Sequence, residues 1–313
     1  MSNNLVITSS PHIRASHTTS TIMRDVIIAL VPALVASIVM FGLRALVLSC
    51  VCVAASMLFE YLYRKLMKLE GNVGDFSAAV TGLLLAFNLP VGIPVWMAVI
   101  GCFVAIVIVK QLFGGIGKNF ANPAIVGRIV LLISFAAPMT TWLLPQNSVT
   151  PDAVLGATPL AAASHAGAVL PGYWDMFLGR IGGSLGETST LALLLGFAYL
   201  VFRKIITVTT PVAFMGTVFI MSWVLGADPL FHLLSGGLVL GAVFMATDYV
   251  TTPTTESGKL IFGIGAGIIT VMIRLYAAYP EGVSFAILLM NILTPHIDNL
   301  TGKKAFGEVK ANG

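Results

Sequence analysis

The chain has 313 residues, of which 57% are hydrophobic and only 10% are charged, and its mean hydropathy is +0.95. Because soluble domains carry about 25% charged residues, this composition excludes an ordinary soluble protein and predicts a polytopic membrane protein. The net charge of +4 fits basic cytoplasmic loops and gives no reason to expect nucleic-acid binding.

Ten apolar runs follow one another along the chain, and most approach the ~20 residues that a helix needs to cross the hydrocarbon core. They predict an all-α fold in five parts: a polar N-terminal segment without a cleavable signal peptide, five helices, a long polar loop, five more helices and a short tail. The parts are residues 1–24, 25–138, 139–185, 186–300 and 301–313. The runs lie near residues 25–42, 45–62, 76–90, 94–112, 121–138, 186–202, 211–226, 231–247, 259–275 and 283–299.

Basic residues are distributed unevenly between the loops. If the N-terminus is cytoplasmic, the opposite face holds little beyond Arg44, Arg180 and Arg274. The positive-inside rule then predicts cytoplasmic termini and places the 139–185 loop on the outer face. The cytoplasmic segments hold Arg14, Arg24, Arg64, Lys65, Lys68, Lys118, Arg203, Lys204, Lys259, Lys303, Lys304 and Lys310.

The two halves resemble each other at an offset of about 160 residues. The run from Gly82 to Pro90 resembles the run from Gly241 to Asp248, and the run 119–123 has a weaker counterpart at 284–286. Since each half has an odd number of helices, the second half must enter the membrane upside down. This predicts two five-helix inverted repeats, an arrangement that places interrupted helices and binding sites between the halves.

Polar residues and prolines stand at two of the span ends. Asn88 to Pro94 and Thr247 to Pro253 form these interruptions. Irregular backbone at membrane depth requires partners from the protein or a wet cavity. The alternative is that both are ordinary capped helix ends.

The outer loop contains Asp152, then Gly156-Ala157-Thr158 followed by Pro159. An Asp six residues before the Thr of a Gly-Ala-Thr triplet resembles a flavin-attachment signal, in which a transferase esterifies FMN through its phosphate to the threonine hydroxyl. The hydroxyl must be exposed for this reaction, and Gly156 and Ala157 leave room around it. A triplet of such common residues also arises by chance, so the motif alone does not decide.

Together with the spans, the repeat and the length, four motifs resemble the NqrB/RnfD family, and within it the RnfD branch, from Rnf ion-translocating ferredoxin:NAD oxidoreductase complexes. The short polar start favours the RnfD branch, and Leu155 stands where the family signal usually has Ser or Thr. The resemblance covers nearly the whole chain. The motifs are residues 74–90, 117–124, 156–160 and 244–248.

The resemblance implies a fold akin to urea transporters, in a bacterial inner membrane. It implies FMN on Thr158 as a phosphoryl threonine and a second, non-covalent flavin, riboflavin, within the bundle. Its implied partners are the other Rnf subunits, including iron–sulfur subunits and a second flavinylated subunit, with a flavin transferase and membrane lipid. The chain has no dinucleotide fingerprint, Walker motif or Cys quartet, so chemistry on NAD or on clusters must come from partners and no catalytic residue is assigned.

Other polar residues have two interpretations each. Asp152 could help the transferase recognise the segment, or could cap a turn. Asp248, at the end of an apolar run, could bind or gate the coupling cation, or could cap a helix end. Asn88, Asn119 and Asn122 are candidates for lining the second flavin. The scattered histidines and cysteines predict no protein-only metal site.

Two other classes of function stay open on the sequence. An inverted-repeat fold also suits a channel or secondary transporter for a small polar solute. A structural scaffold with a vestigial flavin site is the third possibility, with Leu155 as its indication. Covalent flavin separates the first interpretation from both. Whether Na⁺ or H⁺ is the coupling ion does not follow from these residues.

Overall fold

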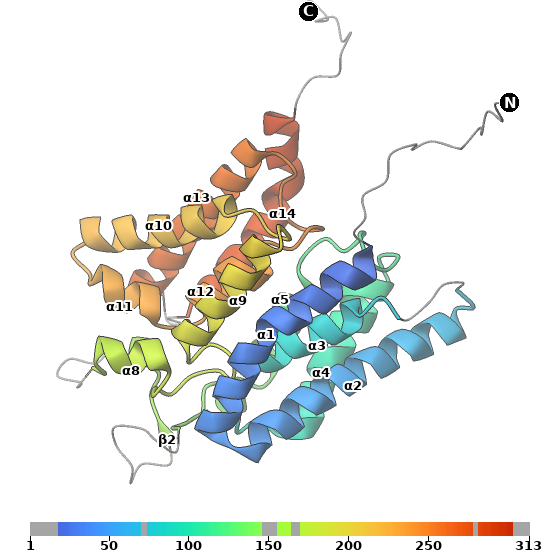
Figure 1. Ribbon diagram of the computed structural model, residues 1–313, viewed down its shortest axis with the longest axis horizontal. Helices are drawn as coiled ribbons and strands as arrows, with labels where there is room; N and C mark the ends of the chain where they lie inside the picture. The colour runs from blue at the N-terminus through green and yellow to red at the C-terminus, as the bar shows by residue number, and fades with distance from the viewer. Residues whose placement is uncertain (1–17, 70–73, 146–154, 164–169, 278–280, 303–313) are drawn as a thin grey trace, which may run out of the picture.

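The computed structural model describes residues 18–69, 74–145, 155–163, 170–277 and 281–302. This part of the chain is mostly helical, as the sequence predicts (Figure 1). Four of its helices are long and apolar enough to cross a membrane, and shorter apolar helices accompany them, so this is a multi-pass membrane protein. The four are α1 (Thr19–Phe41), α2 (Leu43–Leu66), α13 (Glu256–Tyr276) and α14 (Val283–Thr301).

Shorter helices account for most of the remaining predicted spans. In the first half they are α3 (Ser77–Phe87), α4 (Val95–Phe103), which continues as the π-helix η1 (Val104–Gln111), and α5 (Pro123–Ser134). In the second half they are α9 (Thr190–Phe202) and α10 (Thr209–Val224). The first helix begins before residue 25, because the Thr18 hydroxyl accepts a hydrogen bond from the Thr21 N–H and caps α1 there.

The predicted helix at residues 231–247 is not continuous. The structure instead has α11 (Pro229–Leu234), α12 (Leu238–Leu240) and the π-helix η2 (Gly241–Met245). The break falls at Gly236, whose φ of 63° lies in the left-handed region that ends a helix.

The segment between the halves has structure of its own. Strands β1 (Trp142–Leu143) and β2 (Leu155–Gly156) pair antiparallel, with Trp142 opposite Gly156. The short helices are α6 (Ala136–Met139), α7 (Pro159–Ala163) and α8 (Tyr173–Leu178).

Helix α3 lies at the centre of the molecule, with every residue from Ser77 to Phe87 buried. Around it α1 packs against α9, α5 against α14, α2 against α3 and α4, and α10 against α13. Many large apolar side chains of α1 and α2 are exposed, among them Val39 and Leu58. Such a surface suits contact with lipid.

Irregular backbone follows α3, as the proline-rich sequence predicts. The carbonyls of Phe87 and Leu89 accept hydrogen bonds from the N–H groups of Gly186 and Leu185, both at 3.0 Å. A Cβ at Gly186 would lie 2.2 Å from the Phe87 ring, so this close approach requires glycine. The protein itself therefore satisfies the backbone at this interruption.

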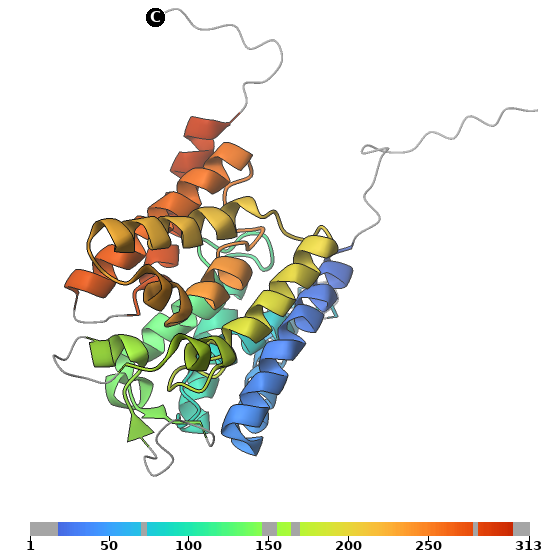
Figure 2. The same ribbon diagram turned by 60° about the vertical axis from the view of Figure 1, so that its left-hand side comes forward.

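The first residue of α1 and the last residue of α14 lie toward one end of the molecule. The α1–α2 turn and β2 lie at the opposite end, as the two views show (Figures 1 and 2). The arrangement separates the segment that carries Thr158 from both ends of the described chain.

Candidate functional site

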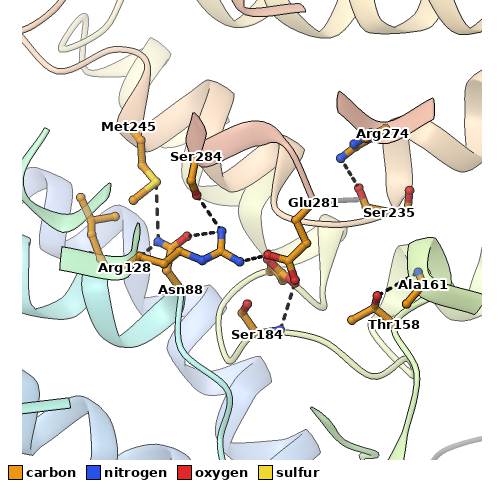
Figure 3. Close-up of polar contacts among 12 residues, drawn as sticks. Asn88, Arg128, Thr158, Ala161, Ser184, Ser235, Met245, Arg274, Glu281 and Ser284 are labelled. Carbon is orange, nitrogen blue, oxygen red and sulfur yellow. Dashed lines mark hydrogen bonds and ion pairs between the residues drawn. The ribbon is translucent and has the colours of Figure 1, made fainter. Parts of the chain in front are cut away.

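Thr158 lies between β2 and α7, and its hydroxyl oxygen accepts a hydrogen bond from the Ala161 N–H at 3.2 Å. Only 4% of its surface is exposed, so the expectation of an exposed hydroxyl is wrong for this conformation. The cause is local, because Thr158 stands at the start of α7 and its hydroxyl is bonded to Ala161 of that helix (Figure 3). Asp152 lies outside the described residues.

A cavity of about 420 Å³ opens beside Thr158. Its volume lies within the ~300–1,000 Å³ range of sites for small molecules and cofactors. Aliphatic and aromatic side chains form most of its wall, and the charged groups are Arg128 and Glu281. Its lining residues are Arg128, Ile129, Leu132, Met139, Thr140, Trp142, Ala157, Thr158, Ala161, Glu281, Gly282, Ser284 and Phe285. Gly156, in β2, comes directly before the lining residue Ala157 in the sequence and is not itself among the lining residues.

Arg128 is a buried cation on α5. It forms an ion pair with Glu281 and donates a hydrogen bond to the Ser284 hydroxyl at 2.7 Å, with a longer contact of 3.5 Å to Asn88 Oδ1 (Figure 3). Glu281, which precedes α14 in the other half of the chain, belongs to none of the sequence motifs and was not predicted as its partner.

A second buried carboxylate, Glu187, lies near this pair. Its Oε1 accepts a hydrogen bond from the Ser184 N–H at 3.0 Å, whereas Oε2 is buried without a hydrogen-bond partner among the described residues. Glu187 interacts electrostatically with both Arg128 and Arg274. Arg274 in turn donates to the carbonyls of Ser235, at 2.9 Å, and of His232.

The three candidate asparagines do not converge on one cavity. Asn88 donates to the Leu84 carbonyl at 2.7 Å and to Met245 Sδ at 3.6 Å, and so joins the Arg128 cluster. Asn122 caps α5 through the N–H groups of residues 124 and 125. Asn119 donates to the Ala121 carbonyl at 3.1 Å. Asn119 and Asn122 line a cavity of about 100 Å³ that is separate from the one beside Thr158, and Asn88 is not among its lining residues.

Asp248 lines that smaller cavity, together with the buried Lys110. It follows η2, and its carboxylate accepts hydrogen bonds from the Val250 N–H at 3.4 Å and the Thr251 hydroxyl at 3.1 Å. Burial raises the pKa of Asp248, and these two hydrogen bonds oppose the shift. The local bonds are those of a turn-forming aspartate, and the cavity leaves the carboxylate available to a ligand.

Lys110 is a buried cation that was not among the predicted site residues. Its ammonium group lies 2.9 Å from the Glu60 carboxylate and 2.5 Å from the Ser77 hydroxyl, and Gln111 donates to the same carboxylate at 2.6 Å. A lysine inside an apolar run was the available signal, since such a residue requires a partner.

A model of the NQR2, RnfD, RnfE family matches residues 6–307. The chain is 48% identical over 312 residues to the D subunit of the Na(+)-translocating ferredoxin:NAD(+) oxidoreductase complex of Acetobacterium woodii, across 98% of this chain and 96% of the relative. It is 44% identical to the D subunit of the proton-translocating ferredoxin:NAD(+) oxidoreductase complex of Clostridium ljungdahlii, across 97% of each chain. It is 36% identical to the D subunit of the ion-translocating oxidoreductase complex of Ectopseudomonas mendocina, across 97% of this chain and 96% of the relative.

Proposed function

This chain belongs to the NQR2, RnfD, RnfE family, and from that premise we propose that it is the flavin-carrying electron-transfer subunit of a redox-driven ion pump. Its relatives are subunits of ion-translocating ferredoxin:NAD(+) oxidoreductase complexes. The observation that carries the proposal is the cavity of about 420 Å³ that Thr158 and a buried arginine line together.

The residues around Thr158 suit FMN attached through its phosphate. The cavity has cofactor size, Trp142 and Phe285 offer aromatic rings, and Arg128 supplies a positive charge near the site of a phosphodiester. Such a flavin supplies one- and two-electron redox chemistry when bound. The residues of this chain hold it, exclude water from it and balance its charge.

The burial of the Thr158 hydroxyl has a consequence for modification. A transferase reaches this oxygen only if α7 is displaced and the hydrogen bond from Ala161 is broken. We therefore place flavin attachment before the segment reaches the described conformation. The phosphoryl threonine then points into the cavity.

The second flavin of the proposal, riboflavin, does not fit the site first expected for it. The cavity lined by Asn119 and Asn122 has about 100 Å³, below the ~300 Å³ at which cofactor sites begin, and the Asn88 side chain is bonded within the protein. The riboflavin is therefore assigned no residues in this conformation.

The proposed architecture is a pair of inverted five-helix repeats, with both termini cytoplasmic and Thr158 on the outer face of the inner membrane. Two contacts between the halves support this architecture. The helices α1 and α9, which correspond to each other in the two repeats, are in contact, and so are the corresponding helices α5 and α14. Lipid surrounds the bundle, and iron–sulfur subunits and a second flavinylated subunit complete the complex.

Asp248 is the proposed ion-coupling residue. It lines the cavity of about 100 Å³, and burial raises its pKa, which favours uptake of a proton by the carboxylate. In complexes with Asp248→Asn we expect electron transfer to continue while ion uptake into vesicles is lost. Unchanged ion uptake per electron would remove Asp248 from the mechanism.

The experiment that tests the proposed function compares Thr158→Ala with Thr140→Ala in the assembled complex. Thr140 lines the same cavity, but its hydroxyl donates to the Ala136 carbonyl at 2.9 Å. Thr158→Ala should lose the flavin, and with it both ferredoxin:NAD oxidoreductase activity and ion uptake. Thr140→Ala should keep the flavin and both activities. Full activity of the Thr158→Ala complex would favour a solute transporter or a scaffold instead.

A further inference from the structure

Another cavity, much smaller than the proposed flavin cavity and the cavity beside Asp248, also borders Thr158. Its volume is about 10 Å³, which is enough for one occupant of the size of a water molecule or a small ion. Thr158 and Glu281 line both cavities and so separate them. Glu187 and Thr188 belong to the smaller cavity alone.

Apolar atoms form most of the wall of this cavity, and four of its lining residues carry side-chain oxygen atoms: Thr158, Glu187, Thr188 and Glu281. Glu187 is 5% exposed and Thr188 is 1% exposed, and Glu187 Oε2 has no hydrogen-bond partner in the described part of the chain. A buried carboxylate oxygen without a partner is costly, and it indicates a group that a ligand satisfies. Carboxylate, hydroxyl and carbonyl oxygens are the ligands that hard cations prefer.

Two glycines leave the room that the Glu187 carboxylate occupies. A Cβ at Gly237 would lie 2.8 Å from Glu187 Oε2, and one at Gly183 would lie 3.2 Å from Oε1. Larger residues at either position would push the carboxylate away from its present site. The backbone is therefore shaped around the charged end of Glu187.

The charges of the cluster favour a cation once the flavin is attached. Glu187 and Glu281 face Arg128 and Arg274, so the cluster is neutral by itself (Figure 3 shows Arg128, Glu281 and Arg274). A phosphodiester on Thr158 adds one negative charge beside it. In a medium of low dielectric constant, one monovalent cation at the carboxylates compensates this charge.

We propose that Glu187, Glu281, Thr158 and Thr188 form a binding site for one Na⁺ ion, directly beside the flavin threonine. The proposal rests on the proposed function, because the added charge comes from the attached flavin. It makes cation affinity depend on the flavin, since each additional negative charge on the flavin strengthens binding of the ion. By linkage, bound Na⁺ then favours reduction of the flavin to its anionic form.

The test uses the purified complex and NaCl as the probe, with KCl keeping the ionic strength constant. The unfolding temperature of the wild type should rise with the Na⁺ concentration. In Glu187→Gln the apparent Kd for Na⁺ should rise by about tenfold or more, which corresponds to about 1.4 kcal/mol. Glu256→Gln, at the exposed start of α13, is the matched control and should keep the wild-type response.

Two further variants keep the outcome clear if Glu187→Gln fails to fold. Thr188→Val preserves shape and removes one oxygen, and Thr158→Ala removes the phosphodiester; both should weaken the response to Na⁺. A wild type whose unfolding temperature does not change when Na⁺ replaces K⁺ overturns the proposal. An undiminished Na⁺ response in all variants places the ion elsewhere and also overturns it.

Flavin fluorescence of the denatured band is recorded for every sample, so the two proposals fail separately. A fluorescent wild-type band without a Na⁺ response rejects the cation site and keeps the flavin. A dark wild-type band rejects the proposed function, whatever the response to Na⁺.

Discussion

At the scale of single residues, buried charges connect the two halves of the chain. Arg128 of α5 meets Glu281 just before α14, and Asp25 of α1 meets Arg203 at the end of α9, 3.0 Å away. Each pair joins residues that are far apart in sequence. Buried charges are tolerated when they are paired, and removal of one partner leaves the other uncompensated.

The Arg128–Glu281 pair provides a prediction for stability. Arg128 is 5% exposed and Glu281 is 22% exposed, so Glu281→Gln should destabilise the protein by roughly the lower end of the ~3–5 kcal/mol found for broken buried pairs. Glu256→Gln breaks an ion pair with Lys259 in which the glutamate is 62% exposed, and it should cost only ~0–1 kcal/mol. Thermal unfolding in detergent measures both variants. Equal losses would contradict the structural role of the Arg128 pair.

At the scale of elements, helices approach closely where glycine permits it. Gly196 on α9 faces the backbone of α1, and a Cβ there would lie 2.2 Å from the Ala29 carbonyl oxygen and 2.9 Å from the Phe244 ring. Small residues at helix contacts are typical of membrane proteins, where close packing replaces the hydrophobic effect. The contact between α1 and α9 depends on this glycine.

Gly196→Ala should therefore separate α1 from α9 and destabilise the protein by about 1–3 kcal/mol, as overpacking does. Gly216 on α10 is the matched control, because a Cβ there meets nothing within 4 Å. Gly216→Ala should be neutral or stabilising by up to ~1 kcal/mol, from helix propensity alone. Comparison of the two unfolding midpoints checks this prediction, and a stable Gly196→Ala variant would contradict the packing of α1 on α9.

At the scale of the whole molecule, the cavity beside Thr158 and the cavity beside Asp248 lie toward opposite ends. The cavity beside Thr158 is lined by residues near β1 and α7, and the cavity beside Asp248 is lined by residues near the start of α1. Figures 1 and 2 place β2 and the start of α1 at opposite ends of the molecule. In the proposed orientation, redox chemistry lies near the outer face and ion entry near the cytoplasm.

The orientation predicts the accessibility of two exposed residues. Arg180 lies next to the Thr158 segment, and Lys118 lies in the turn before α5. In a cysteine-free background, a membrane-impermeant maleimide should label Arg180→Cys in right-side-out vesicles and Lys118→Cys only in inside-out vesicles. Labelling with the sides exchanged would invert the proposed topology.

Much of this arrangement follows from sequence, and the parts that do not have physical reasons. Apolar runs predicted the helices because hydropathy and length are local properties. The break at Gly236 was missed because the surrounding residues are as apolar as a helix. Thr158 was identified from its motif, but its burial and the partner Glu281 depend on tertiary contacts across the halves. The asparagines were expected around one ligand, whereas capping and backbone bonds place them apart.

The central claim is that Thr158 carries a covalent redox cofactor. The most direct test is ultraviolet fluorescence of the denatured, acid-fixed band on a gel, after co-expression with the flavin transferase, for the wild type, Thr158→Ala and Thr140→Ala. We predict fluorescent wild-type and Thr140→Ala bands and a dark Thr158→Ala band. A dark wild-type band, with the transferase active on a control substrate, would contradict the claim.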